Sequence, residues 1–249
     1  MNILGYYYDH LLSQVDPNIP KENYSILIDV EGDGFCGWRA LAVQIYDDEH
    51  QFWTVKKKMR DTLFKNEKFY RDNFKDYFNF DEVKKRVCYG IEETVGSDVV
   101  RDELFVKDGD TEDEVKYFCN PEYYFSSVGC PQLAADTFFG PITLYSEKEY
   151  QNTRGVSYIP LLTEYTDAEI KKKRPQPLLL QRVNQNHWVT LGLRRSKKLP
   201  CPLPDHSYEF ATKDLKKVAN IKKTVWNYYL VFAQQLPKDS GMFVLILQS

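Results

Sequence analysis

ILIDVEGDGFCGWRALAVQIYD, residues 26–47, is the stretch that decides the fold of the chain around it. Its first and mostly apolar residues, Ile26–Val30, predict a short strand, and the glycine-broken residues 31–35 predict a sharp turn. From Cys36 onward apolar residues recur at helical spacing, namely Trp38, Leu41, Ala42 and Ile45. The sequence therefore predicts a strand, a turn and a helix, with Cys36 at or beside the first helical residue.

Cys36 stands at a place that favours a nucleophile. Unpaired backbone N–H groups gather in the first turn of a helix, and the positive end of the helix dipole favours an anion there. A thiol in that place ionises more easily, and the thiolate is the form that attacks carbonyl carbons. Cysteines also often fill hydrophobic cores, so the alternative for Cys36 is a structural role.

The composition is that of a globular protein. The chain has 249 residues, enough for one large domain or two small ones, and 43 % of them are hydrophobic. No apolar run is long enough to span a membrane, and the N-terminus lacks the pattern of a secretory signal. The five cysteines are scattered and never in C-x-x-C spacing, which disfavours both a disulfide framework and a zinc site. We expect an intracellular, cytoplasmic protein, with a monomer as the default.

The net charge of −3 is unevenly distributed. Residues 92–114 hold ten acidic residues against two basic ones, and residues 171–249 hold fifteen basic residues against four acidic ones. These runs are either solvated surface or interaction surfaces, an acidic face for a basic partner and a basic tail for an acidic one. No known nucleic-acid-binding motif accompanies the basic run, so no nucleic acid is expected as a partner.

The remaining chain predicts an α+β (α/β-like) fold with a small central sheet packed between helices. A second amphipathic helix carries Phe52, Val55, Met59 and Leu63, with Lys56, Lys57 and Lys58 between its apolar positions. Several short helices are expected over residues 66–120, and a further helix begins near Pro131 and ends near Gly140. Strands are expected at Ile142–Tyr145, Val156–Leu161, Leu178–Val183, His187–Leu193, Val225–Phe232 and Met242–Gln248.

His187 is the best candidate for a base that serves Cys36. Among the four histidines, His10 lies in the N-terminal lead-in, His50 between two helices and His206 in a proline-rich loop. His187 stands where a hairpin turn becomes a strand, which can hold an imidazole rigidly beside a helix terminus. Taken alone, a histidine at the end of a strand is more often structural.

The same turn allows a competing interpretation. Gly32, Gly34 and Gly37 spell the G-x-G-x-x-G fingerprint of dinucleotide-binding proteins. Two features disfavour it, because Asp33 would place a carboxylate where a pyrophosphate should bind, and the helix runs into another helix rather than a second strand. The glycines are better explained as the bend that exposes Cys36.

Two stretches resemble a known family. Residues 33–41, DGFCGWRAL, resemble the D-G-x-C-x-[FW]-R-A-[LIV] signature of the OTU (ovarian-tumour) cysteine proteases, which are deubiquitinases. Asn186-His187-Trp188 resembles their distal N-H-[YW] motif, and residues 131–145 resemble the helix and strand that precede it. The resemblance runs from about Tyr24 to Leu193. It implies a papain-like fold with a variable helical arm, here residues 60–125, and no metal or other cofactor.

The resemblance implies a role for each matching residue. Cys36 would attack the carbonyl of the C-terminal glycine of ubiquitin, polyubiquitin or a ubiquitin-like modifier, and His187 would move the proton. Backbone N–H groups of the loop Asp33-Gly34-Phe35 would stabilise the oxyanion, and Trp188 would line the channel for the Gly-Gly tail. The acidic run of the arm, with Glu112 and Glu114, could suit the arginines of the ubiquitin tail.

The third catalytic residue departs from the family pattern. Many members place Asp or Asn two residues after the histidine, where this chain has Val189. Asp33 is the first candidate for this role, Asn184 or Asn186 could orient the imidazole instead, and a dyad could suffice. The alternative for Asp33 is a turn carboxylate that caps the helix.

The expected organisation is a lead-in over residues 1–24, a catalytic domain over 25–195 and a C-terminal extension over 196–249 that packs on the same domain. The expected function is a thiol-dependent deubiquitinase. The alternatives are a catalytically silent ubiquitin-binding module and, less favoured, a dinucleotide-binding oxidoreductase.

Overall fold

A computed structural model describes residues 9–17, 19, 21–74, 78–91, 105–107, 115–117, 119–145, 155–162 and 177–193 of the chain. The expected strands Val225–Phe232 and Met242–Gln248, the C-terminal extension, His206 and the acidic residues Glu112 and Glu114 lie outside these residues.

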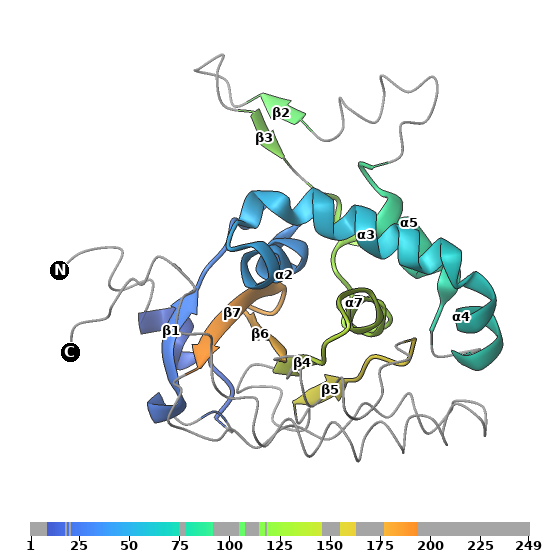
Figure 1. The fold of residues 1–249 in the computed structure, drawn as a ribbon. Helices are drawn as coiled ribbons and strands as arrows, with labels where there is room; N and C mark the ends of the chain where they lie inside the picture. Colours follow the sequence, from blue (N-terminus) through green and yellow to red (C-terminus); the bar gives the residue numbers. More distant parts are fainter. Residues whose placement is uncertain are drawn as a thin grey trace.

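The centre of the fold is a five-stranded sheet in the order β1-β7-β6-β4-β5 (Figure 1). The strands are β1 Tyr24–Ile28, β4 Ile142–Tyr145, β5 Val156–Tyr158, β6 Leu178–Val183 and β7 His187–Leu193. All neighbouring pairs are antiparallel except β4 and β6, which are parallel. This sheet and its helices make the fold α+β, as the sequence predicted.

Helices α2, α3 and α7 lie on one side of the sheet (Figure 1). The α-helices are α2 Cys36–Tyr46, α3 Phe52–Lys65, α4 Glu67–Phe74, α5 Phe80–Cys88 and α7 Cys130–Phe138. Short 3-10 helices are η1 Lys21–Asn23, η2 Glu49–Gln51 and η3 Pro121–Tyr123. The predicted amphipathic helices after residues 35 and 51 and near Pro131 are confirmed.

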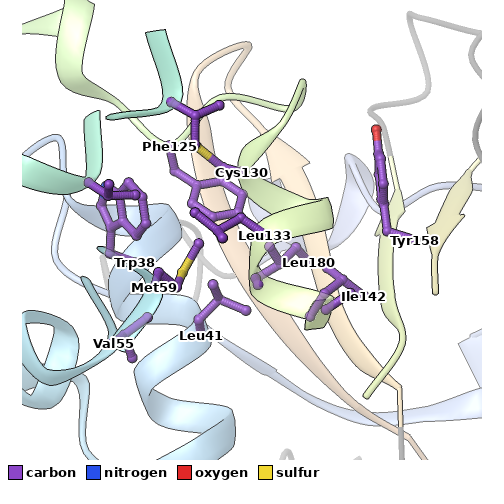
Figure 2. Close-up of a cluster of buried hydrophobic side chains, with 14 of the residues drawn as sticks. Trp38, Leu41, Val55, Met59, Phe125, Cys130, Leu133, Ile142, Tyr158 and Leu180 are labelled. Atoms are coloured by element: carbon purple, nitrogen blue, oxygen red, sulfur yellow. The ribbon is translucent and has the colours of Figure 1, made fainter. Parts of the chain in front are cut away.

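The apolar face of α2 anchors the larger hydrophobic core. Trp38 and Leu41 are fully buried and converge on Met59 of α3, Leu133 of α7 and Leu180 of β6 (Figure 2). Since each buried aliphatic or aromatic side chain stabilises a fold by roughly 1.5–3 kcal/mol, this cluster fixes α2, and with it Cys36, against the sheet.

The opposite face of the sheet carries a second cluster. Leu179 and Val183 of β6 pack there with the buried Leu11, Val15 and Ile19 from the N-terminal lead-in. Neighbouring residues of a strand point to opposite faces, so Leu179 enters this cluster while the next residue of β6 enters the other. The sheet is therefore covered on both faces.

Several predicted boundaries match the structure and others differ. The hairpin β6–β7 has the predicted bounds, whereas β1 begins two residues earlier than expected and ends at Ile28, and β5 ends at Tyr158 rather than Leu161. The prediction of several short helices over residues 66–120 is wrong at two segments, because β2 Phe105–Lys107 and β3 Val115–Tyr117 are strands that pair antiparallel. Both segments are rich in aromatic and β-branched residues, which favour strands.

Candidate active site

Cys36 is the first residue of α2 and is 4 % exposed. The turn before it requires glycine, because Gly34 has a φ of +88° and an added Cβ would lie 2.5 Å from Tyr124 Cε1. A Cβ at Gly37 would lie 2.4 Å from Phe125 Cβ. Tyr124 and Phe125, which follow η3, therefore pack closely against the turn and the first turn of α2. Only glycine leaves room for this close approach.

His187 begins β7 and lies beside Cys36. The hairpin register pairs Val183 with His187, and the three-residue turn before it brings the Asn186 carbonyl oxygen to 3.9 Å from Cys36 Sγ. The imidazole of His187 lies close enough to Cys36 for that residue to help raise the pKa of His187. The structure thus brings together the two residues that sequence motifs 150 residues apart had singled out.

The other side of the imidazole faces Asp29, a residue that the sequence analysis did not select. His187 Nε2 lies 2.7 Å from Asp29 Oδ1. Strands β1 and β7 pair antiparallel with Ile28 opposite Thr190, so the chain just past Ile28 runs alongside the start of β7. The feature of the sequence that could have identified Asp29 is that it is a lone acidic residue within the apolar run Ile26–Val30.

The pKa of His187 is raised to about 9. Burial alone lowers this pKa, because it disfavours the charged ring, but the hydrogen bonds and the charges of Asp29 and Cys36 outweigh the burial. The imidazole is therefore protonated at neutral pH, held between a carboxylate on one side and a sulfur on the other.

Asp33 faces a different group from the one expected. Its Oδ1 accepts the Phe35 N–H at 2.9 Å, and its Oδ2 accepts two hydrogen bonds from Arg39 at 2.7 and 3.1 Å. The residue at the N-cap of α2 is Phe35, with no side-chain cap. Asp33 thus stabilises the turn by bonding to Arg39 and to the Phe35 N–H. The carboxylate next to His187 belongs to Asp29.

The two asparagines of the hairpin turn also contact other groups. Asn184 Oδ1 accepts a hydrogen bond from Gln14 Nε2 at 2.7 Å. Asn186 is exposed, and its carbonyl oxygen faces Cys36. Trp188 is 6 % exposed and packs edge-on against Phe125, with ring centroids 6.1 Å apart.

The hydrogen bonds of the turn constrain the direction of the Gly34 N–H. The Asp33 carbonyl oxygen accepts the N–H of the buried Cys119 at 2.8 Å. A trans peptide directs its C=O and N–H to opposite sides, so the Gly34 N–H points away from Cys119. The Phe35 N–H is already bonded to Asp33. The loop N–H best placed for a ligand is therefore that of Gly34, together with that of Cys36 in the first turn of α2.

The dinucleotide interpretation finds little support in this geometry. Strand β1 pairs antiparallel with β7, and α2 is followed by α3. A Rossmann unit would place a parallel strand beside β1. The Asp33 carboxylate also lies inside the turn that should cradle a pyrophosphate.

The described residues form neither a disulfide nor a metal site. Among them, Cys36, Cys88, Cys119 and Cys130 are free thiols, and no group of three or more His, Cys, Asp or Glu side chains could hold a metal ion. None of the helices that the structure describes has the length and apolar character needed to cross a membrane.

The arrangement is chemically suited to nucleophilic attack on a carbonyl. It holds a sulfur at a helix N-terminus, an imidazole near it, a carboxylate 2.7 Å from the imidazole, and the backbone N–H groups of Gly34 and Cys36 beside the sulfur. These are the parts that acyl transfer through a covalent intermediate requires.

The structure is similar to crystal structures of three viral OTU domain proteases. That from Qalyub virus is 12 % identical with a TM-score of 0.42, covering 69 % of this chain and 85 % of that one. That from Farallon virus is 18 % identical with a TM-score of 0.39, covering 72 % and 89 %. That from Dera Ghazi Khan virus is 12 % identical with a TM-score of 0.36, covering 69 % and 82 %. No protein-family model matches the sequence, and no curated protein sequence matches it.

Proposed function

We propose that this chain is an OTU-like cysteine protease that cleaves the bond after the C-terminal glycine of ubiquitin. The observation that carries the proposal is the contact of His187 with Asp29 at 2.7 Å on one side and with Cys36 on the other. The sequence motifs around Cys36 and His187 support ubiquitin as the substrate, and Asp29 takes the orienting role for which Asp33 was the first candidate.

In the acylation step, the Cys36 sulfur attacks as a thiolate that the adjacent imidazolium stabilises. A C–S bond forms, and the carbonyl π electrons move to oxygen, where the N–H groups of Gly34 and Cys36 stabilise the negative charge. When the C=O bond re-forms, the C–N bond breaks and His187 gives its proton to the leaving amine. The ubiquitin tail is then held as a thioester.

In the deacylation step, the neutral His187 removes a proton from water as the water attacks the thioester carbon. A second oxyanion forms in the same place, and the C–S bond breaks as the C=O bond returns. Ubiquitin leaves as a carboxylic acid, which releases its proton to solvent, and the enzyme regains its thiolate and imidazolium. Asp29 keeps the ring in one orientation throughout both steps.

The test uses ubiquitin with a C-terminal electrophile and, in parallel, ubiquitin with a C-terminal fluorogenic amide. The native chain should form a covalent adduct that is lost in Cys36→Ala and retained in Cys88→Ala. His187→Ala should lower the rate of hydrolysis by about 10²–10⁴-fold, the range for a general acid–base group. His10→Ala, which changes an exposed histidine, is the matched control. Binding of ubiquitin without capture or hydrolysis would identify the silent module instead.

Asp29→Asn tests the carboxylate separately from the hydrogen bond. The asparagine oxygen can still accept from His187 Nε2, but the negative charge that helps to raise the pKa of His187 is gone. The native rate should fall as pH rises past about 9, where His187 loses its proton, and in Asp29→Asn this fall should move to lower pH. An unchanged pH profile would remove Asp29 from the site.

A further inference from the structure

The turn between β1 and α2, residues 31–35, is held by one buried arginine. Arg39 lies one turn into α2 beyond Cys36 and is fully buried. Its Nε and Nη2 donate to Asp33 Oδ2 at 3.1 and 2.7 Å, and Nη2 also lies 2.8 Å from Glu31 Oε2. One side chain therefore holds the turn at two points.

A third carboxylate completes the arrangement. Glu49 of η2 lies 3.7 Å from Arg39 Nη1, and its Oε2 accepts the Glu31 backbone N–H at 3.0 Å. The guanidinium also lies over the Phe52 ring, 4.3 Å from its centroid. The orientation of the guanidinium is thus fixed by three carboxylates and an aromatic face, which a flexible point charge could not match.

These contacts extend to the peptide that would bind the oxyanion. Arg39 fixes the Asp33 carboxylate, whose other oxygen holds the Phe35 N–H. The Cys119 N–H holds the Asp33 carbonyl oxygen. The Gly34 N–H between them points away from Cys119, and its direction depends on all of these bonds.

We propose that Arg39 is a positioning residue for the oxyanion loop: by holding Asp33 and Glu31, it keeps the Gly34 N–H directed at the carbonyl oxygen of the substrate. The inference rests on the proposed function and adds to it a residue that touches neither the sulfur nor the imidazole. A donor that is already in place needs no reorganisation when the carbonyl oxygen gains charge. This preorganisation is how such loops accelerate the reaction.

Two reactions of the same thiolate separate this role from a general structural one. Hydrolysis of a ubiquitin C-terminal amide places negative charge on the carbonyl oxygen. Alkylation by chloroacetamide forms a C–S bond and releases chloride, with no charge on a carbonyl oxygen. If Arg39 positions the loop, its replacement should slow hydrolysis and leave alkylation of Cys36 unaffected.

The main variant is Arg39→Lys, which keeps the positive charge but cannot hold two carboxylates in a fixed plane. Loss of an oxyanion donor costs about 10²–10³-fold in kcat, so a misdirected donor should cost about 10–100-fold, with KM nearly unchanged. The affinity for ubiquitin ending in an aldehyde should fall by a similar factor, because its adduct with Cys36 places an oxygen in the same position. Equal slowing of alkylation and hydrolysis would overturn the proposal.

A matched control and a milder variant keep the test decisive. Arg71→Lys changes an exposed arginine that also pairs with two carboxylates, Glu67 and Asp81, and should leave both reactions unchanged. Glu31→Gln changes a 44 % exposed side chain and should lower kcat several-fold without slowing alkylation. If Arg39→Lys does not fold, Glu31→Gln decides the matter, and a native kcat in that variant overturns the proposal.

The outcome for the native chain separates this inference from the proposed function. A native chain that hydrolyses no ubiquitin substrate would reject the proposed function. A native chain that hydrolyses ubiquitin, with Arg39→Lys equally fast, would reject the role of Arg39 alone.

Discussion

Arg39 and Lys56 are both fully buried cations, yet the fold surrounds them with opposite kinds of groups. Arg39 lies within 4.0 Å of Glu31, Asp33 and Glu49. Lys56 Nζ has no hydrogen-bond partner in the part of the chain that the structure describes. It lies 4.9–5.7 Å from the centroids of four aromatic rings, those of Phe35, Trp38, Trp53 and Tyr89.

The difference shows what a buried charge requires. Burial lowers the pKa of Lys56 to about 8, and the nearby thiols Cys119, Cys130 and Cys88 offset this only in part. Burial also raises the pKa of Cys119 to about 12 and that of Cys130 to about 11, so these two remain neutral and supply no counter-charge at neutral pH. The aromatic faces attract the ammonium, but they replace its hydration incompletely.

Arg39→Met should cause the largest loss of stability. Removing one partner of a buried ion pair leaves the other charge uncompensated, and this typically costs about 3–5 kcal/mol. Here the carboxylate left behind is Asp33, whose side chain is 4 % exposed. Urea unfolding at neutral pH measures the effect, and Arg71→Met, at an exposed pair, should cost under about 1 kcal/mol. A loss for Arg39→Met as small as that of the control would contradict the buried pairing.

Lys56→Met should have the opposite sign. A shift of the pKa from 10.5 to about 8 corresponds to a cost of about 3 kcal/mol while the amine is charged. Methionine has a similar length, needs no hydration and packs well against aromatic rings, so the variant should be more stable than the native chain by up to about 3 kcal/mol. Urea unfolding at neutral pH is the measurement, and a less stable variant would show that the rings compensate the charge fully.

The pH dependence sharpens this second prediction. Below pH 8 the Lys56 amine is charged in both the folded and the unfolded chain, so the cost of burying it is fully present. As pH rises from about 8 to 10.5, the folded chain releases this proton first, and the native protein gains stability. The advantage of Lys56→Met, measured against the native chain at equal pH, should therefore shrink over this range. An advantage that stays constant would mean that Lys56 titrates normally.

Lys56→Arg should have a smaller effect, in the destabilising direction. The guanidinium is larger than the ammonium, and overpacking of a core typically costs about 1–3 kcal/mol. It also stays charged throughout the alkaline range, so the gain in stability of the native chain above pH 8 should be absent. Thermal unfolding at neutral and alkaline pH measures both effects, and an arginine variant as stable as the native chain would indicate that the aromatic cluster tolerates any cation.

The two cations also show where sequence patterns succeed and where they fail. The apolar stripe of α3 was predicted from Phe52, Val55, Met59 and Leu63, and these residues are buried as expected. From the sequence, Lys56 was predicted to lie between the apolar positions of this helix, whereas the structure buries it fully. It follows Phe52 by four residues and precedes Met59 by three, so helical spacing places it on the buried face, but its charge favoured the solvated interpretation.

The candidate catalytic residues show a related limit. The turn before Cys36 and the hairpin before His187 depend on local sequence, and both were predicted with their elements. Asp29 depends on the pairing of β1 with β7, strands separated by about 160 residues, and no local pattern encodes that register. Asp33 was selected because it lies three residues before Cys36, but its carboxylate accepts hydrogen bonds from Arg39, in the next turn of the helix, and from the Phe35 N–H.

Glu49→Gln should have the smallest effect and separates the two functions of that side chain. The glutamine oxygen can still accept the Glu31 N–H, while the negative charge near Arg39 is lost. At 30 % exposure and 3.7 Å from Nη1, this charge should contribute under about 1 kcal/mol of stability. Glu49→Ala removes the acceptor as well and should cost about 1 kcal/mol more. If urea unfolding shows equal losses for both variants, then Glu49 serves Arg39 by its charge; a loss only in Glu49→Ala means that it holds the turn through the Glu31 backbone.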